Sequence, residues 1–488
     1  MGDLKLANTP SIKSMPSDQG NHSNERSNPD IIDGNEYIDP KIERSLVRKF
    51  DIFILPMCAL VYYTHTLDRA NLGNAKTMGI QTDLGLINNE FSLVLILFYI
   101  PYGICNIPAA LLAKRFNPAR VIPLMMGTWG ALSTITASTT NFGGLLTVRI
   151  LIGIVEASFM PCVYLYYSLF YTRKELALRT AAWGFTGFIA GATSGLIAWD
   201  VSQWHRSLSG WQYLFLIEGG MTVAISVIVF FVLPRDTSSK FFTADEQRVA
   251  RIRLSRESEL EGVGKIEWET AFAVLSNWHV WAFAAMAFLC GVGVASASNF
   301  LPTMVKRIAT TTPKANLYTV GPNLVAAAVQ IVSSWISDRY QQRALVSFFT
   351  LLVSMVGFIL LATLDLVHNT RVGYFITYLI TFGTYMPELL MPLWLSSNLT
   401  SASARAVALG LFIGGQNIGG ILSSAVFRDE YAPVYKPALI TVAICQGILL
   451  LALLAMRQTY VTLNRKLARG EIGPVKGMEN NPGFRYAI

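Results

Sequence analysis

The sequence predicts an all-α integral membrane protein with twelve transmembrane helices arranged as two six-helix halves. Of its 488 residues, 52% are hydrophobic and only 14% are charged, whereas soluble domains carry about 25% charged residues. The mean hydropathy is +0.42, and the apolar residues form twelve long runs. One long polar stretch separates the sixth run from the seventh. A lipid-facing surface needs no charge, so these observations together indicate a polytopic membrane protein.

Each predicted span approaches the length that a bilayer requires, about 20 mostly apolar residues. Six runs precede the polar stretch, at 51–71, 91–113, 120–139, 143–167, 179–200 and 211–233. Six follow it, at 279–301, 317–337, 343–364, 372–395, 405–427 and 437–457. The first is interrupted by Asp68 and Arg69, and the tenth carries Pro387, Glu388 and Pro392.

The polar segments divide the chain into five regions. Residues 1–48 are rich in Ser, Asn and Asp and predict a disordered tail. The two six-helix halves are expected at 49–233 and 279–457, with a linker at 234–278 and a second tail at 458–488.

A helix is expected within the linker. Thr243 and Glu246 have the spacing of a capping box, which starts a helix by satisfying free backbone N–H groups. Basic residues follow it, so this amphipathic helix either lies on the anionic cytosolic leaflet or is a solvated connector. These residues are Arg248, Arg251, Arg253 and Arg256.

The distribution of basic residues predicts the orientation of the chain. Lys and Arg gather before the first span and after the second, fourth, eighth and twelfth spans, and such loops face the cytosol. The exception is the basic group after the seventh span, Lys306, Arg307 and Lys314. Both ends of the chain are therefore expected in the cytosol, and the plasma membrane is the expected location.

Several functional classes are disfavoured by composition and motifs. The net charge of +8 is concentrated in short loops, which is a topology signal rather than a nucleic-acid footprint. The five cysteines all fall inside apolar runs, without metal-ligand spacing. No nucleophile elbow, phosphate loop or dinucleotide fingerprint occurs. We therefore expect that the protein is not an enzyme and binds no cofactor or metal. Its expected energy source is a proton gradient.

Ionisable side chains inside the predicted spans are the candidate functional residues, because each costs several kcal/mol at bilayer depth. Arg149 and Glu156 are seven residues apart and share one helix face. Asp68 and Arg69 are adjacent and point about 100° apart, so they cannot face one partner. The other such residues are Glu218 in the sixth span and Glu388 in the tenth.

These charges suggest a site for an anion and a proton. A buried arginine keeps its charge and offers a planar fork that suits a carboxylate, so Arg69 is predicted to bind substrate, with Arg149, Tyr164 and Glu388 as further substrate-binding candidates. Glu156 and Asp68 are the candidates for proton coupling. The alternative is that some of these charges simply pair to hold helices together, as we expect for Glu218.

A weak internal repeat follows the second and eighth spans. The first copy is Ala110-x-x-x-Lys114-Arg115 and the second is Ser334-x-x-x-Asp338-Arg339. Both resemble the G-x-x-x-D-R-x-G-R signature of major facilitator proteins, although Lys114 replaces the usual acid. The resemblance implies the major facilitator fold and a gating role for Lys114, Arg115, Asp338 and Arg339.

Seven further segments carry recognisable motifs: 67–75 (LDRANLGNA), 149–161 (RILIGIVEASFMP), 210–219 (GWQYLFLIEG), 394–398 (WLSSN), 405–410 (RAVALG), 417–420 (NIGG) and 432–435 (APVY). Together they resemble a narrower family, the anion:cation symporters, and within it the fungal allantoate permease branch and its nicotinate-permease-like members. The resemblance implies that Arg69 binds the substrate carboxylate and that Asp68 is linked to proton movement. It departs at the seventh span, where Cys290 stands near the position of an arginine found in vesicular relatives.

The function that the resemblance implies is proton-coupled uptake of a small organic anion by alternating access. The expected substrate is a monocarboxylate such as nicotinate, allantoate or pantothenate, and the expected state is a monomer in the lipid bilayer. The alternatives are an exporter of a fungal secondary metabolite and a transporter-like nutrient sensor.

Overall fold

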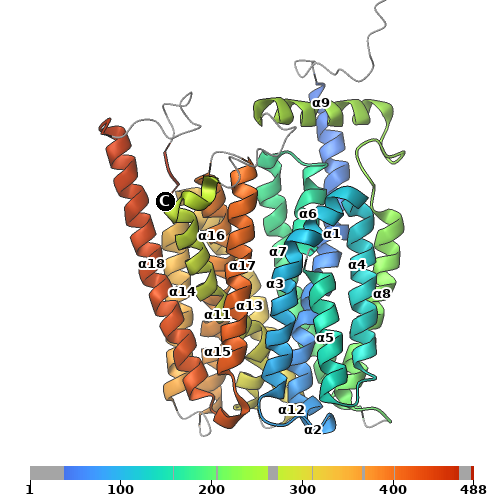
Figure 1. Ribbon diagram of the computed structural model, residues 1–488, viewed down its shortest axis with the longest axis vertical. Coiled ribbons are helices and arrows are strands. Elements are labelled where there is room, and N and C mark those ends of the chain that lie inside the picture. The colour runs from blue at the N-terminus through green and yellow to red at the C-terminus, as the bar shows by residue number, and fades with distance from the viewer. Residues whose placement is uncertain are drawn as a thin grey trace, which may run out of the picture.

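The computed structural model describes residues 38–157, 159–204, 207–261, 273–309, 311–364, 369–399, 402–471 and 485–487. All regular secondary structure in these residues is helical, and most helices run roughly parallel in two bundles that stand side by side (Figure 1). Helix α9 (Ala244–Glu261) lies across one end, which we call the linker end. The short helices α2 (Ile80–Asp83) and α12 (Thr312–Leu317) lie at the opposite end, which we call the far end.

Each half of the molecule contains six of the expected spans. The first half comprises α1 (Pro40–Thr77), α3 (Glu90–Phe116), α4 (Pro118–Thr136), α5 (Phe142–Glu156), α6 (Phe159–Ser168), α7 (Arg173–Val201) and α8 (Gly210–Val232). The second comprises α11 (Trp278–Lys306), α13 (Val320–Tyr340), α14 (Arg343–Thr363), α15 (Thr370–Thr384), α16 (Met386–Ser397), α17 (Ala402–Val426) and α18 (Lys436–Ala468). Short 3₁₀ turns lie at η1 (Val274–Ser276) and η2 (Asp429–Tyr431). The halves meet where α1 packs on α11, α3 on α17, and α7 on α12 and α13.

The predicted all-helical membrane fold is confirmed. In the described part of the chain, six segments are long and apolar enough to cross a bilayer on composition alone. They are Gly210–Val232, Trp278–Lys306, Thr312–Tyr340, Arg343–Thr363, Val407–Val426 and Lys436–Ala468.

Two spans that the sequence predicts as continuous are each divided into two helices. The fourth span divides into α5 and α6, directly after Glu156, and the tenth divides into α15 and α16 at Tyr385. Proline explains the second break, because Pro387 has no N–H to donate to the carbonyl four residues before it. The two breaks occupy equivalent positions in the two halves, and interrupted helices at equivalent positions are typical of transporter binding sites.

The first and last long helices extend past the predicted boundaries of their spans and into the predicted tails. Helix α1 begins at Pro40 rather than near residue 49; Asp39 accepts a hydrogen bond from the Lys41 N–H (2.8 Å) and caps it. Helix α18 continues to Ala468, past the expected end at 457. The rest of the first tail, 1–37, lies outside the described residues.

The predicted capping box starts α9. The Glu246 carboxylate accepts from the Thr243 N–H (3.0 Å), and the Thr243 hydroxyl accepts from the Glu246 N–H (3.4 Å). Glu246 also forms an ion pair with Lys49 of α1 (2.8 Å). Burial alone raises the pKa of Glu246, but the hydrogen bonds from Lys49 and Thr243 outweigh it and hold the pKa below its usual value. The carboxylate is therefore charged and tied to the first half.

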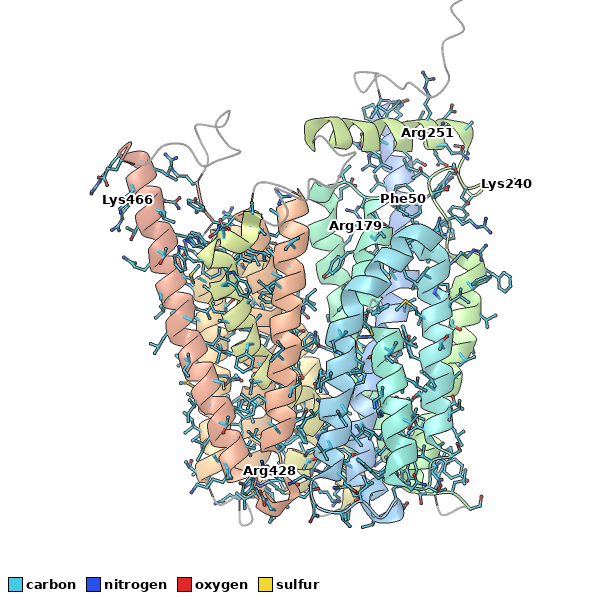
Figure 2. The ribbon with its side chains drawn as sticks, in the orientation of Figure 1. Phe50, Arg179, Lys240, Arg251, Arg428 and Lys466 are labelled. Atoms are coloured by element: carbon cyan, nitrogen blue, oxygen red, sulfur yellow. The ribbon has the colours of Figure 1, made fainter. Side chains whose placement is uncertain are left out.

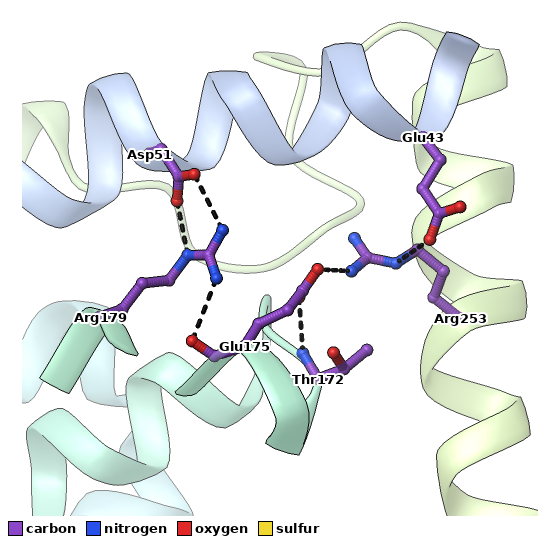
Figure 3. A network of polar contacts seen from close by, with 6 residues as sticks. All are labelled: Glu43, Asp51, Thr172, Glu175, Arg179 and Arg253. Carbon is purple, nitrogen blue, oxygen red and sulfur yellow. Dashed lines mark hydrogen bonds and ion pairs between the residues drawn. The ribbon is translucent and has the colours of Figure 1, made fainter. Parts of the chain in front are cut away.

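A network of ion pairs fixes α9 to the first half (Figure 3). Arg253 of α9 bridges Glu43 of α1 (3.1 Å) and Glu175 of α7 (2.6 Å), and Arg179 of α7 pairs with Asp51 of α1 (2.6 Å). Arg253 is buried, so the expectation that it faces lipid or solvent is wrong. Arg251 is exposed on the outer side of α9 (Figure 2), and the side chain of Arg256 lies outside the described residues.

Candidate functional site

Helix α1 directs its two adjacent charges to different partners. Asp68 is buried in the first half, where it accepts hydrogen bonds from Ser133 of α4 (2.5 Å) and Asn71 (3.3 Å). The Arg69 guanidinium instead faces α3, where it lies 4.9 Å from the centre of the Tyr102 ring and 5.5 Å from that of Phe98. Cation–π contacts of this kind stabilise a desolvated arginine.

Glu156 is the residue at which the fourth span breaks, and it lies between two basic side chains of α1. Its carboxylate oxygens are 3.6 Å from Arg69 Nε and 3.5 Å from His65 Nε2. Charge-assisted hydrogen bonds are usually 2.7–2.9 Å long, so neither contact is a close pair. The His65 ring is itself held by stacking on Phe159 at 4.6 Å.

A small polar cavity joins these residues to the second half. It is lined by Asp68, Arg69, Leu72, Leu95, Phe98, Tyr99, Arg149, Ile152, Glu156, Ser298 and Asn299. The cavity volume is about 40 Å³, and one water requires roughly 10–15 Å³ on this measure. A few waters fit, but a monocarboxylate requires the space to widen.

The two arginines at this cavity have N–H donors that are not used in hydrogen bonds to described residues. Arg69 Nη2 and both Nε and Nη2 of Arg149 are buried and make no hydrogen bond to any described residue. Arg149 rests its guanidinium 5.5 Å from the Phe215 ring centre. Buried, unsatisfied guanidinium donors are costly, and a carboxylate entering the cavity would satisfy them.

Tyr164 and Glu388 do not line this cavity, although both were predicted to bind substrate. Glu388 lies in the first turn of α16, accepts a hydrogen bond from Gln416 of α17 (2.7 Å), and is near enough to Arg69 to interact electrostatically. Tyr164 is 43% exposed, lies within similar reach of Glu388, and packs its ring 6.0 Å from that of Trp183. Both residues thus lie beside the cavity rather than in its wall.

Glu218 is fully buried inside the first half. Neither of its carboxylate oxygens makes a hydrogen bond to a described residue, although Asn71 and Ser194 are its neighbours. It does not line the cavity.

Asp338 and Arg339, two of the predicted gating residues, do not line this cavity. Asp338 and Arg339 are exposed at the linker end of α13. The side chains of Lys114 and Arg115 lie outside the described residues. Within the described part of the chain, no cluster of three or more His, Cys, Asp or Glu side chains could hold a metal.

The residues that connect the halves at the far end were not predicted. Lys76 of α1 forms an ion pair with Asp429 of η2 (2.8 Å), and Gln81 donates to the other oxygen of Asp429 (2.6 Å). Aromatic rings of Phe91, Phe300 and Tyr435 surround the Lys76 ammonium at 4.6–5.6 Å. Charged residues are common at the ends of membrane spans, so the sequence contained no signal that these two residues form a pair.

Asn299 and Ser298 of the seventh span were also missed. Asn299 donates to the Tyr99 hydroxyl across the halves (3.1 Å). The available signal was the group of polar residues at 296, 298 and 299 within an otherwise apolar span.

Comparisons with known proteins agree with this architecture. The family model for the Major Facilitator Superfamily matches residues 58–424. The chain is 39% identical to the major facilitator-type transporter hxnP of Emericella nidulans over 471 residues, covering 93% of this chain and 95% of that protein. It is 37% identical to the MFS-type transporter efuF of Hormonema carpetanum, covering 89% and 88%.

Solved structures show the same fold at low identity. The xylose transporter XylE from E. coli, in a partially occluded inward open conformation, aligns with a TM-score of 0.65 at 12% identity, covering 84% of this chain and 98% of that one. A bacterial homologue of the human lysosomal transporter Spinster, inward-facing and occupied, aligns with a TM-score of 0.62 at 14% identity, covering 84% and 97%. The chain therefore belongs to the major facilitator superfamily, as a secondary transporter and not an enzyme.

Proposed function

We propose that this transporter carries a small organic anion together with protons, and that Arg69 binds the carboxylate. The observation that carries the proposal is the pair of arginines that line one polar cavity, each with at least one buried guanidinium nitrogen that makes no hydrogen bond to a described residue. A carboxylate offers the two acceptor oxygens that match a guanidinium fork.

Glu156 is proposed to carry the coupled proton. Its contacts with Arg69 and His65 are loose, and its side chain is only 1% exposed. When Arg69 turns to a substrate carboxylate, Glu156 loses a positive neighbour and its protonated form is favoured. Protonation and substrate binding would thereby occur together, which is the requirement for symport.

The finer assignment follows from motifs and contacts. We infer an anion:cation symporter of the allantoate permease branch, working as a monomer in the plasma membrane on a monocarboxylate such as nicotinate, allantoate or pantothenate. The linker end is assigned to the cytosol, because Lys240, Arg251 and Lys466 lie there (Figure 2) and basic residues face inward.

Uptake of radiolabelled monocarboxylates by yeast expressing the chain tests this proposal. Uptake is measured at pH 5 and pH 7.5, with and without a protonophore. We expect acid-stimulated, protonophore-sensitive uptake that Arg69→Ala lowers at least about tenfold, equivalent to about 1.4 kcal/mol of binding. Glu156→Gln should remove the pH dependence, since its amide cannot exchange a proton.

Arg428→Ala is the matched control. Arg428 is an exposed far-end arginine paired with Glu430 (3.3 Å), so uptake should be unchanged. If no anion enters but a preloaded metabolite leaves faster, the chain is an exporter and the direction proposed here is wrong. If Arg69→Ala transports normally, Arg69 is a structural charge.

A further inference from the structure

A short segment of the chain packs against the linker end of the second half. Residues 485–487 lie against the last turn of α16 and the linker-end part of α18, where Tyr486 and Ala487 join the apolar cluster of Phe283, Trp394 and Tyr460. The segment is remote in sequence from α16, so its place there is a tertiary contact.

Two asparagine side chains hold the backbone of this segment. Asn464 of α18 accepts from the Tyr486 N–H (2.8 Å) and donates to the Tyr486 carbonyl (2.9 Å). Asn398, at the end of α16, accepts from the Ala487 N–H (2.8 Å) and donates to the Ala487 carbonyl (3.3 Å). An asparagine amide can do both because it carries an acceptor and donors. Two side-chain amides thus satisfy the backbone N–H and C=O groups of both Tyr486 and Ala487.

Aromatic contacts also hold the segment in place. The Tyr486 ring stacks on Tyr460 of α18 with centroids 5.2 Å apart, and Tyr460 meets Trp394 of α16 edge-on at 5.7 Å. The Trp394 indole N–H donates to the Ala487 carbonyl (2.8 Å). The segment is therefore held by one aromatic ring and by the backbone carbonyl of the residue that follows it.

The segment contacts the helix that carries Glu388. Helix α16 has only 12 residues, is separated from α15 at Tyr385, and holds Glu388 in its first turn. Its first turn is joined to α17 through Glu388 and Gln416, and its last turn to residue 487 through Trp394 and Asn398. Besides its packing on α11, α14 and α17, the last turn of α16 is bound by Arg343 at the Leu393 carbonyl and by residue 487, so a segment remote in sequence contributes to its position.

We propose that this surface of α16 and α18 is a docking site for residues 485–487, and that occupancy of the site holds α16 in place. Release of the segment frees the linker end of α16 and thereby loosens Glu388 beside the transport cavity. The inference is independent of which substrate is carried or in which direction.

Hydrogen–deuterium exchange on the full-length protein in lipid nanodiscs tests the proposal. The amides of Tyr486 and Ala487 are hydrogen-bonded to the two asparagines, so their slow exchange reports docking directly. Tyr486→Ala and Asn464→Ala should each raise exchange at 486–487 by at least about tenfold. They should also raise exchange across 386–397, while 142–168 in the other half is unchanged.

Neither substituted residue belongs to α16, so faster exchange there follows from release of the segment and not from a change in that helix. Tyr486→Phe keeps the ring and should behave as the wild type. Fast exchange at 486–487 in the wild-type protein would overturn the docking site. Release of the segment with no change at 386–397 would overturn its hold on α16.

Discussion

At the residue scale, neighbouring charges on α1 have separate tasks because the helix turns about 100° between them. Asp68 accepts hydrogen bonds from Ser133 and Asn71 inside the first half, whereas Arg69 lies beside Glu156. Both charges line the cavity. The buried carboxylate of Asp68 thus depends on a hydroxyl from α4. We expect this contact to matter for stability as well as for coupling.

Ser133→Ala is expected to lower the free energy of unfolding by about 1–3 kcal/mol, because it leaves a buried acceptor without its donor. The change is measured as a lower melting temperature of the purified protein in detergent. Ser138→Ala is the control, since the exposed Ser138 hydroxyl bonds only its own helix, at the Ile135 carbonyl. Equal melting temperatures for both variants would show that Asp68 does not depend on Ser133.

At the element scale, the second half is organised around the close approach of α11 and α17. A Cβ added at Gly419 of α17 would overlap the Phe288 carbonyl of α11, and one at Gly291 would overlap the Gln416 carbonyl. Small residues at a contact between two membrane helices let their backbones approach closely. Such close packing matters in a membrane, because apolar side chains bury equally well against lipid and against another helix. This pair of helices carries Asn299 to the wall of the cavity and Gln416 to Glu388.

Gly419→Ala should therefore destabilise the protein by about 1–3 kcal/mol, as overpacking does in well-packed interiors. Gly414→Ala lies on the same helix with no atom within 4 Å of the added Cβ, and it should be neutral or stabilise by up to about 1 kcal/mol. The stability of the two variants is compared by heating each protein and then measuring, by size-exclusion chromatography, how much remains folded. Similar losses for both variants would contradict the close approach.

At the scale of the whole molecule, the described polar contacts between the halves lie toward the far end. They join α1 and η2 through Lys76 and Asp429, and α1 and α12 through Thr77 and Asn316 (3.0 Å). Alternating access requires these contacts to break when the far end opens. The Lys76–Asp429 contact is an ion pair, and the Lys76 side chain in it is only 5% exposed.

Asp429→Ala leaves the buried Lys76 ammonium unpaired, which typically costs about 3–5 kcal/mol. The equilibrium should shift toward an open far end, where water reaches Lys76. Spin labels at the exposed positions Ile87 and Val434 report this as a longer distance by electron paramagnetic resonance. Glu430→Gln removes only an exposed pairing with Arg428 and should leave the distance unchanged. An unaltered distance in Asp429→Ala would rule out the pair as a far-end latch.

Local patterns were sufficient to predict the fold class and many of the site residues. Hydropathy runs located the spans, because a helix must satisfy its own backbone in lipid. The Thr243–Glu246 spacing predicted the start of α9, because capping acts within one turn. Charges inside apolar runs identified Asp68, Arg69, Arg149 and Glu156, since such charges are costly without a function or a partner.

The partners of these residues were decided by tertiary structure alone. Arg69 and Glu156 meet because the fourth span breaks beside α1, and Lys76 meets Asp429 although they lie 353 positions apart. The seat of residues 485–487 between α16 and α18 has no local signal either. Hydropathy shows that a helix lies in lipid, but the neighbours of that helix depend on shape and on hydrogen bonds between distant segments. The sequence by itself therefore determined a facilitator with a buried charge cluster, and the packing of its helices decided which charges act together.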